Sequence, residues 1–128
     1  MGFKLGKRSL ERLEGVHPDI VRVVKRAIEI TEIDFTVLEG VRTKEKQRHY
    51  VEIGASQTMN SKHLIQSDGY AHAVDLGAYV NGQVSWHWPL YHKIAAAMFK
   101  ASNEFGVDLE WGGDWLSFPD GPHWQKAA

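Results

Sequence analysis

Three histidines and two aspartates supply the side chains that could carry chemistry in this sequence. His63, His72 and Asp75 lie close together in the middle of the chain, and His123 follows in a late segment. Imidazole nitrogens with one carboxylate oxygen form the ligand set of catalytic zinc sites, which keep one position open for water. Asp120, three residues before His123, adds a carboxylate that could accept a proton from that water. These residue types predict a zinc-dependent hydrolase.

Strand geometry decides between the two earlier histidines. The segment Ala73–Gly77 is predicted to be a strand, and residues an odd number apart on a strand face opposite sides. His72 and Asp75 should therefore diverge, whereas His63, in the preceding loop, can fold back beside Asp75. We expect His63, Asp75 and His123 to bind Zn²⁺. His72 is expected to support the ligands through a hydrogen bond or to pack on the far face of the strand.

The remaining histidines have no convergent partner in the sequence, and two further aspartates lie in predicted loops and turns. We expect the histidines to be solvated or structural and the aspartates to be loop and turn carboxylates; they are His17, His49, His87, His92, Asp68 and Asp108.

The elements that must position these residues follow from periodicity and from capping residues. Ile20, Val23, Val24 and Ala27 recur at helical spacing after Pro18 and form one apolar stripe. The expected helices span 9–14, 18–31, 44–52 and 89–105, with Thr43 as a cap of the third and Gly106 ending the last. The expected strands span 35–39, 73–77, 107–111 and 123–125, with a hairpin at 79–84 built on Asn81-Gly82. Strands scattered among helices and joined by tight turns predict an α+β fold, with a mainly antiparallel sheet flanked by helices.

Composition limits the classes of protein that fit. The chain has 128 residues, which fits one domain over residues 1–128. A net charge of −1 gives no electrostatic signature of nucleic-acid binding, and no apolar run is long enough to insert into a membrane. The absence of cysteine excludes disulfides and thiolate-bound zinc. We expect a monomer.

The motifs together resemble a known family of enzymes. Ser61-x-His63, Ala73-x-Asp75 and Asp120-x-x-His123 are similar to the motifs of LAS-type zinc peptidases that cut bacterial cell-wall peptides. This family includes D-Ala-D-Ala carboxypeptidases and dipeptidases, and the small phage endolysins that act as L-alanyl-D-glutamate peptidases. The resemblance is greatest to the phage enzymes and extends over most of the chain, including the segments 2–9, 34–43, 79–82 and 112–115. One difference is the longer interval between His63 and Asp75.

The resemblance implies a fold of the hedgehog/D,D-peptidase type and a role for several residues. Zn²⁺ would be bound by His63, Asp75 and His123, Asp120 would be the catalytic base, and Arg42 would steady the oxyanion or a substrate carboxylate. We expect Ser61 to bind substrate or only to hydrogen-bond its own loop. Three tryptophans are expected either to border the peptide groove or to pack in the core: Trp111, Trp115 and Trp124.

Two other functions stay open at this point. One is a D-Ala-D-Ala carboxypeptidase or dipeptidase on the same scaffold, and the other is a zinc-binding module without catalysis. The N-terminal segment has no apolar core of the length that a signal peptide needs. We therefore expect a phage lysin that stays in the host cytoplasm until the membrane is permeabilised and then cleaves the stem peptide of peptidoglycan between L-Ala and D-Glu.

Overall fold

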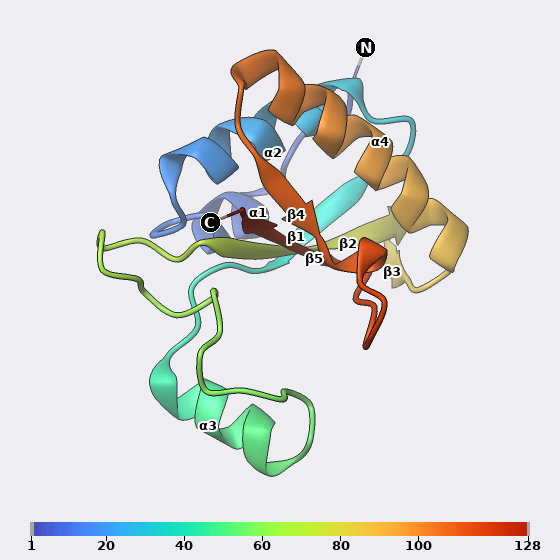
Figure 1. Ribbon diagram of the computed structural model, residues 1–128. Helices are drawn as coiled ribbons and strands as arrows, with labels where there is room; N and C mark the ends of the chain where they lie inside the picture. Colours follow the sequence, from blue (N-terminus) through green and yellow to red (C-terminus); the bar gives the residue numbers. More distant parts are fainter. Residues whose placement is uncertain (1, 128) are drawn as a thin grey trace.

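A five-stranded sheet forms the centre of the structure, a computed structural model that describes residues 2–127 (Figure 1). All of its strand pairs are antiparallel, which confirms the expected α+β class with a mainly antiparallel sheet. The helices are α1 (Lys7–Arg12), α2 (Pro18–Ile30), α3 (Lys44–Glu52), α4 (Trp88–Phe105) and the 3-10 helix η1 (Gly112–Asp114). The strands are β1 (Phe35–Glu39), β2 (Ala73–Val80), β3 (Gln83–Ser85), β4 (Leu109–Trp111) and β5 (His123–Lys126).

The order of the strands places the last of them inside the sheet. The main path runs β1-β2-β5-β4, and β3 pairs with the outer half of β2 through the hairpin at Asn81-Gly82. Strand β2 therefore pairs with β1 along one edge and with β5 and then β3 along the other. Because β2 is held on both sides, its side chains have fixed directions.

One face of the sheet carries the hydrophobic core. Figure 1 shows α2 and α4 lying together over this face. The predicted stripe of α2 is buried there, together with alternate residues of β2, namely Val74, Leu76 and Ala78. Because successive side chains of a strand alternate in direction, Asp75 points to the opposite face. The packing of the core thus decides which side of the sheet receives the carboxylate.

The opposite face of the sheet is covered only in part. Helix α3 and the first part of the segment that follows it lie on this side, as Figure 1 shows in green. Thr43 caps α3 as predicted, since its hydroxyl accepts a hydrogen bond from the Lys46 N–H at 3.1 Å.

Strand β4 is shorter than expected because Val107 takes part in the hydrogen bonding that closes the end of α4. Gly106 adopts a left-handed conformation with φ of 67°, and the Val107 N–H donates to the Ser102 carbonyl at 2.9 Å. This is the hydrogen bond that closes a helix when glycine follows its last turn. The strand therefore begins only at Leu109. Within residues 2–127, no helix has the length and apolar character needed to cross a membrane.

Candidate metal centre

Pairing between β2 and β5 brings two of the three expected ligands together. Asp75 and His123 are direct partners in the antiparallel register, so their side chains share one face of the sheet. His123 Nδ1 lies 3.2 Å from Asp75 Oδ1. Two residues 48 positions apart in the sequence are thus brought together by the backbone pairing of β2 with β5 alone.

The third expected ligand comes from the loop before β2. The His63 carbonyl accepts a hydrogen bond from the Arg42 N–H at 2.9 Å, which ties this loop to the segment that follows β1. His63 is buried, and its Nε2 lies 3.2 Å from Asp75 Oδ1. The two histidines and the aspartate form one group whose ligand atoms all lie within 4.8 Å of one another. The structure therefore brings the three sequence-predicted ligands together.

Hydrogen bonds on the outer side of each imidazole determine which nitrogen is free. His63 Nδ1 lies 2.8 Å from the Gly40 carbonyl oxygen, which can only accept, so Nδ1 carries the proton and Nε2 is left as a ligand. His123 Nε2 lies 2.9 Å from Gln125 Oε1, so Nδ1 is free on that ring. The Gln125 amide donates to Glu110 at 3.1 Å, which fixes its oxygen toward His123. Such partners orient the histidines of metal sites.

The inner atoms of the group have the spacing that a metal requires. A tetrahedral ion with bonds of about 2.0–2.1 Å separates its ligand atoms by roughly 3.3 Å, close to both distances of 3.2 Å here. Two unprotonated ring nitrogens and a carboxylate oxygen converge, and these lone pairs favour a cation between them. The donor set of two imidazoles and one carboxylate fits Zn²⁺, with the cleft side left for water.

The charges of the group also shift its titration. Burial raises the pKa of the Asp75 carboxyl, but without an ion the imidazoles, once doubly protonated, donate hydrogen bonds to this carboxylate, which outweigh burial and hold that pKa well below its usual range. Burial lowers the pKa of His123, and the bond to Asp75 reverses this, so that the pKa is raised overall. Asp75 is thus ionised at neutral pH, as a metal-binding carboxylate must be.

The expected base and the expected arginine lie beside this group. Asp120 lines the same cleft, and its N–H donates to the Gly112 carbonyl at 2.9 Å. Gly112 has no space for a side chain, because a Cβ atom there would lie 2.4 Å from the Asp120 carbonyl oxygen. Burial, followed by the negative charge of Asp75, raises the pKa of the Asp120 carboxyl and makes it a better proton acceptor than a solvated aspartate.

Arg42 is held rigidly at the edge of the group. It pairs with Glu39, donates to Gln47 Oε1 at 2.7 Å and lies 4.7 Å from the centre of the Tyr50 ring. Its Nη2 is 4.0 Å from Asp75 Oδ2, so the guanidinium faces the metal ligands. An arginine fixed in this way presents a preorganised positive charge to a bound carbonyl or carboxylate oxygen.

An open cleft of about 790 Å³ contains the group and extends between α3 and the segment 115–120. Ser61 and Trp115 line it, and contact between these two side chains and a substrate stays a prediction. Trp111 and Trp124 do not reach it. Both are buried and stack on each other at 5.8 Å between ring centres, so the expectation that they border the groove is wrong and the packing alternative holds.

His72 belongs to a different group. Its Nε2 lies 2.7 Å from Asp68 Oδ2, and His17 Nε2 is 3.8 Å from the same oxygen. His72 therefore does not support the expected ligands but lies on the far side of the strand, which is the second of the two expectations for it. The expectation that His17 has no convergent partner is wrong, because a backbone bridge between Val16 and Ala71 brings its segment beside the loop that holds Asp68.

Sequence reasoning missed the residues that hold the ligands in place. Gln125 could have been found, because it lies two positions after His123 on a predicted strand and must share its face. Gly40 and Glu39 gave no such signal, since their roles depend on how the chain folds after β1.

A partly covered antiparallel sheet with a His/Asp/His group in an open cleft is the arrangement of a metallopeptidase-like hydrolase. Comparison with known proteins narrows this class. The profile of the family described as phage L-alanyl-D-glutamate peptidase matches residues 1–126. The L-alanyl-D-glutamate peptidase of Escherichia phage T5 is 32% identical over 124 residues, which cover 94% of this chain and 87% of that protein.

Two further relatives agree with this match. The L-alanyl-D-glutamate peptidase of Listeria phage A118 is 38% identical over 93 residues, 73% of this chain and 30% of that longer protein. The crystal structure of Serratia marcescens L-Ala D-Glu endopeptidase ChiX superposes with a TM-score of 0.87 at 45% identity, covering 94% of this chain and 87% of that one. The chain belongs to the phage L-alanyl-D-glutamate peptidase family, and its activity is that of an L-alanyl-D-glutamate peptidase.

Proposed function

We propose that this peptidase is a zinc enzyme that cleaves the L-Ala–D-Glu bond of the peptidoglycan stem peptide as a phage endolysin. His63, Asp75 and His123 would hold the ion. The observation that carries this assignment is the placement of the two imidazoles: the outer nitrogen of each faces an acceptor oxygen, of Gly40 or Gln125, and the inner nitrogen faces Asp75.

The chemistry of the site divides between the ion and the side chains around it. When bound, Zn²⁺ lowers the pKa of a water molecule and polarises the scissile carbonyl. Asp120 accepts the proton of the attacking water and returns it to the departing amine of D-Glu, for which its raised pKa is suited. Arg42 donates to the oxygen on which negative charge develops, and a single donor of this kind contributes roughly 3–4 kcal/mol in other enzymes.

The open shape of the cleft favours an endopeptidase over a D-Ala-D-Ala carboxypeptidase or dipeptidase. A D-Ala-D-Ala carboxypeptidase or dipeptidase needs a pocket closed around a terminal carboxylate. Here the cleft is open, and its lining includes Ser61 and the exposed Phe118. Retention of Asp120 and Arg42 beside the ligands argues against a zinc module without catalysis. In the life of the phage, the enzyme would reach the cell wall after the host membrane is permeabilised, and there it would act as a monomer.

Digestion of purified peptidoglycan tests the proposal. The zinc-loaded enzyme should release stem peptides that begin with D-Glu and leave L-Ala on the muramic acid, as read by mass spectrometry. Asp120→Asn keeps the shape of the side chain but cannot accept the proton, so turnover should fall at least about a hundredfold while zinc stays bound. Release of D-Ala or of the D-Ala-D-Ala dipeptide, with the L-Ala–D-Glu bond intact, would contradict the assignment.

A further inference from the structure

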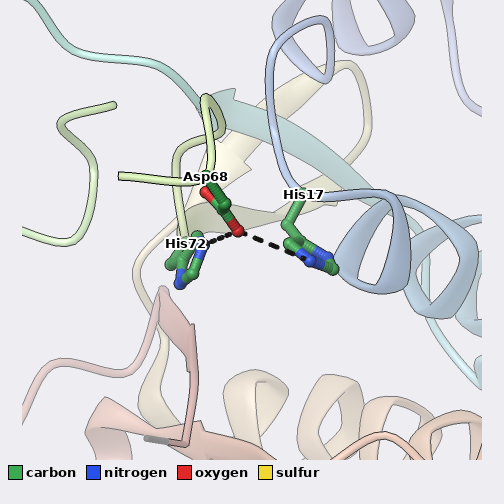
Figure 2. Close-up of side chains that lie close together, drawn as sticks. All are labelled: His17, Asp68 and His72. Carbon is green, nitrogen blue, oxygen red and sulfur yellow. Dashed lines mark hydrogen bonds and ion pairs between the residues drawn. The ribbon is translucent and has the colours of Figure 1, made fainter. Parts of the chain in front are cut away.

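We propose that His17, Asp68 and His72 form a second binding site for a divalent metal of the zinc class, separate from the candidate catalytic centre. Figure 2 shows the three side chains converging from the start of α2 and from the loop that leads into β2. One ligand atom from each lies within 4.8 Å of the other two. The ion would fasten the loop 64–72 to α2.

The donor atoms meet the chemical requirement for such a site. Two imidazoles and one carboxylate are a zinc ligand set that leaves a position for water. The two nitrogen–oxygen distances of 2.7 and 3.8 Å lie on either side of the roughly 3.3 Å expected between ligands of a tetrahedral ion. The side chains are 20–40% exposed, so an ion and its water can reach them. Small rotations of the side chains, without movement of the backbone, would complete the site.

Backbone hydrogen bonds already hold the two segments that supply the ligands. The His17 N–H donates to the Ala71 carbonyl, and the Ala71 N–H donates to the Gly15 carbonyl, both at 2.9 Å. Asp68 Oδ1 accepts the Tyr70 N–H at 3.1 Å, which turns Oδ2 toward both histidines. The ordering of these residues is therefore a result of folding, and an ion that binds them loses little affinity to further ordering.

The position of the proton on the His17 ring affects how tightly this site binds zinc compared with the His63 centre. Its Nδ1 accepts the Asp19 N–H at 3.1 Å, so without an ion the neutral ring carries its proton on Nε2, facing Asp68. Metal binding at Nε2 requires the ring proton on Nδ1, so the hydrogen bond from the Asp19 N–H is lost and Asp19 Oδ2, 3.9 Å from Nδ1, becomes the acceptor toward which this N–H can turn. A carboxylate behind a ligating histidine is a common arrangement. Because this proton must move first, the second site should bind zinc more weakly than the His63 centre, whose outer hydrogen bonds are already formed.

Zinc titration of the whole chain by calorimetry tests the second site. The unaltered protein should bind one equivalent tightly and a second more weakly. Asp68→Asn can still accept a hydrogen bond from His72 but loses the charged ligand. The zinc affinity of the second site should therefore fall by at least roughly 10- to 100-fold, which is the loss expected when only a hydrogen-bond partner of a metal ligand is removed. His72→Ala should abolish the second equivalent. Both variants should keep the tight equivalent, and His123→Ala should lose only that one.

A matched control separates a defined site from stray binding to surface histidines. His49 is exposed and belongs to neither group, so His49→Ala should keep both equivalents. Circular dichroism should show native helix content in every variant, and Asp68→Asn serves as the decisive variant if His72→Ala is misfolded. A single zinc equivalent in the unaltered protein, or two unchanged equivalents in Asp68→Asn, would overturn the proposal. Failure of the catalytic assignment would appear in the tight equivalent and in peptide cleavage.

Discussion

The outward hydrogen bonds of the two buried histidines do much to define the candidate centre. Gly40 fixes His63 through a backbone carbonyl, which no side-chain substitution removes. Gln125 fixes His123 through a side chain, and this side chain is in turn held by Glu110. The His123 side of the centre is therefore the side that mutation can loosen without removing a ligand.

Substitution of Gln125 should reveal this positioning role. Gln125→Leu removes the acceptor for His123 Nε2–H, so we expect zinc affinity to fall roughly 10- to 100-fold, as for other partners that orient metal ligands. Gln125→Glu keeps an acceptor and should largely retain affinity. Competition with a chromogenic chelator measures both. Equal affinities for the two variants would show that the hydrogen bond does not orient the ring.

Glu39 should contribute to stability in a pH-dependent way. Burial raises the pKa of its carboxyl, but hydrogen bonds from Arg42 and Lys46 prevail, so the folded pKa lies below that of the unfolded chain. The contribution is then complete above the unfolded pKa of about 4.3 and is lost as the pH falls through the lower folded value. Urea unfolding in the presence of a chelator should show that the unaltered protein and Glu39→Gln differ less in free energy of unfolding as the pH is lowered below about 5. A difference that is constant with pH would contradict this.

The site residues differ in how far sequence could predict them. His63, Asp75 and His123 could be chosen because zinc chemistry limits the residue types and strand alternation separates Asp75 from His72. His17 could not, because only a bridge between Val16 and Ala71, far apart in sequence, brings it to Asp68 and His72. Tryptophans were ambiguous for a physical reason: their large rings suit both a groove and a core, and only burial distinguishes the two.

At the scale of elements, α1 is fastened to β1 by a buried serine. Ser9 Oγ accepts the Val37 N–H at 3.0 Å and lies 2.9 Å from Thr36 Oγ1. Arg12 adds a bond to the Val37 carbonyl at 2.9 Å. These contacts position the end of β1, from which Gly40 and Arg42 extend into the candidate centre.

Removal of the Ser9 hydroxyl should weaken the whole domain. Ser9→Ala leaves the buried Val37 N–H without its partner, and we expect a loss of about 1–3 kcal/mol in the free energy of unfolding. Ser102→Ala is the control: that hydroxyl is also buried, but it donates to the Phe99 carbonyl within α4, so its loss should be about 1 kcal/mol or less. Urea denaturation compares them, and equal losses would contradict the argument.

Several element boundaries followed from local chemistry and others did not. Strand 35–39 and helix 44–52 agree with the structure, because β-branched residues and a threonine cap act locally. Helix α1 starts two residues before the expected Ser9, and β4 starts two residues after Val107. The order β1-β2-β5-β4 has no local signature, since strand pairing depends on contacts between distant segments.

At the scale of the whole molecule, metal and fold should be coupled. The candidate centre joins β2, β5 and the loop before β2, so a chelator should both abolish peptide cleavage and lower the melting temperature. A ligand at a thousand times its Kd contributes about 4 kcal/mol, which corresponds to roughly 10 °C or more for a domain of this size. One equivalent of zinc should restore both properties in the unaltered protein and only the melting temperature in Asp120→Asn. Full cleavage by the chelated enzyme would exclude a metal mechanism.

The position of β5 also orders events during synthesis. This strand enters the sheet between β2 and β4 although both precede it in the chain, and it carries His123. Until residue 126 has left the ribosome, residues 73–75 of β2 lack a partner on the edge that β5 occupies, and the proposed ligand set lacks His123. A nascent chain can therefore form helices and the β1–β2–β3 part of the sheet, but without the proposed ligand His123 we expect it not to hydrolyse peptide. Activity begins only when the chain between β2 and β5 closes into a loop and the two strands pair. This closure carries an entropic penalty, and no shorter intermediate can replace it.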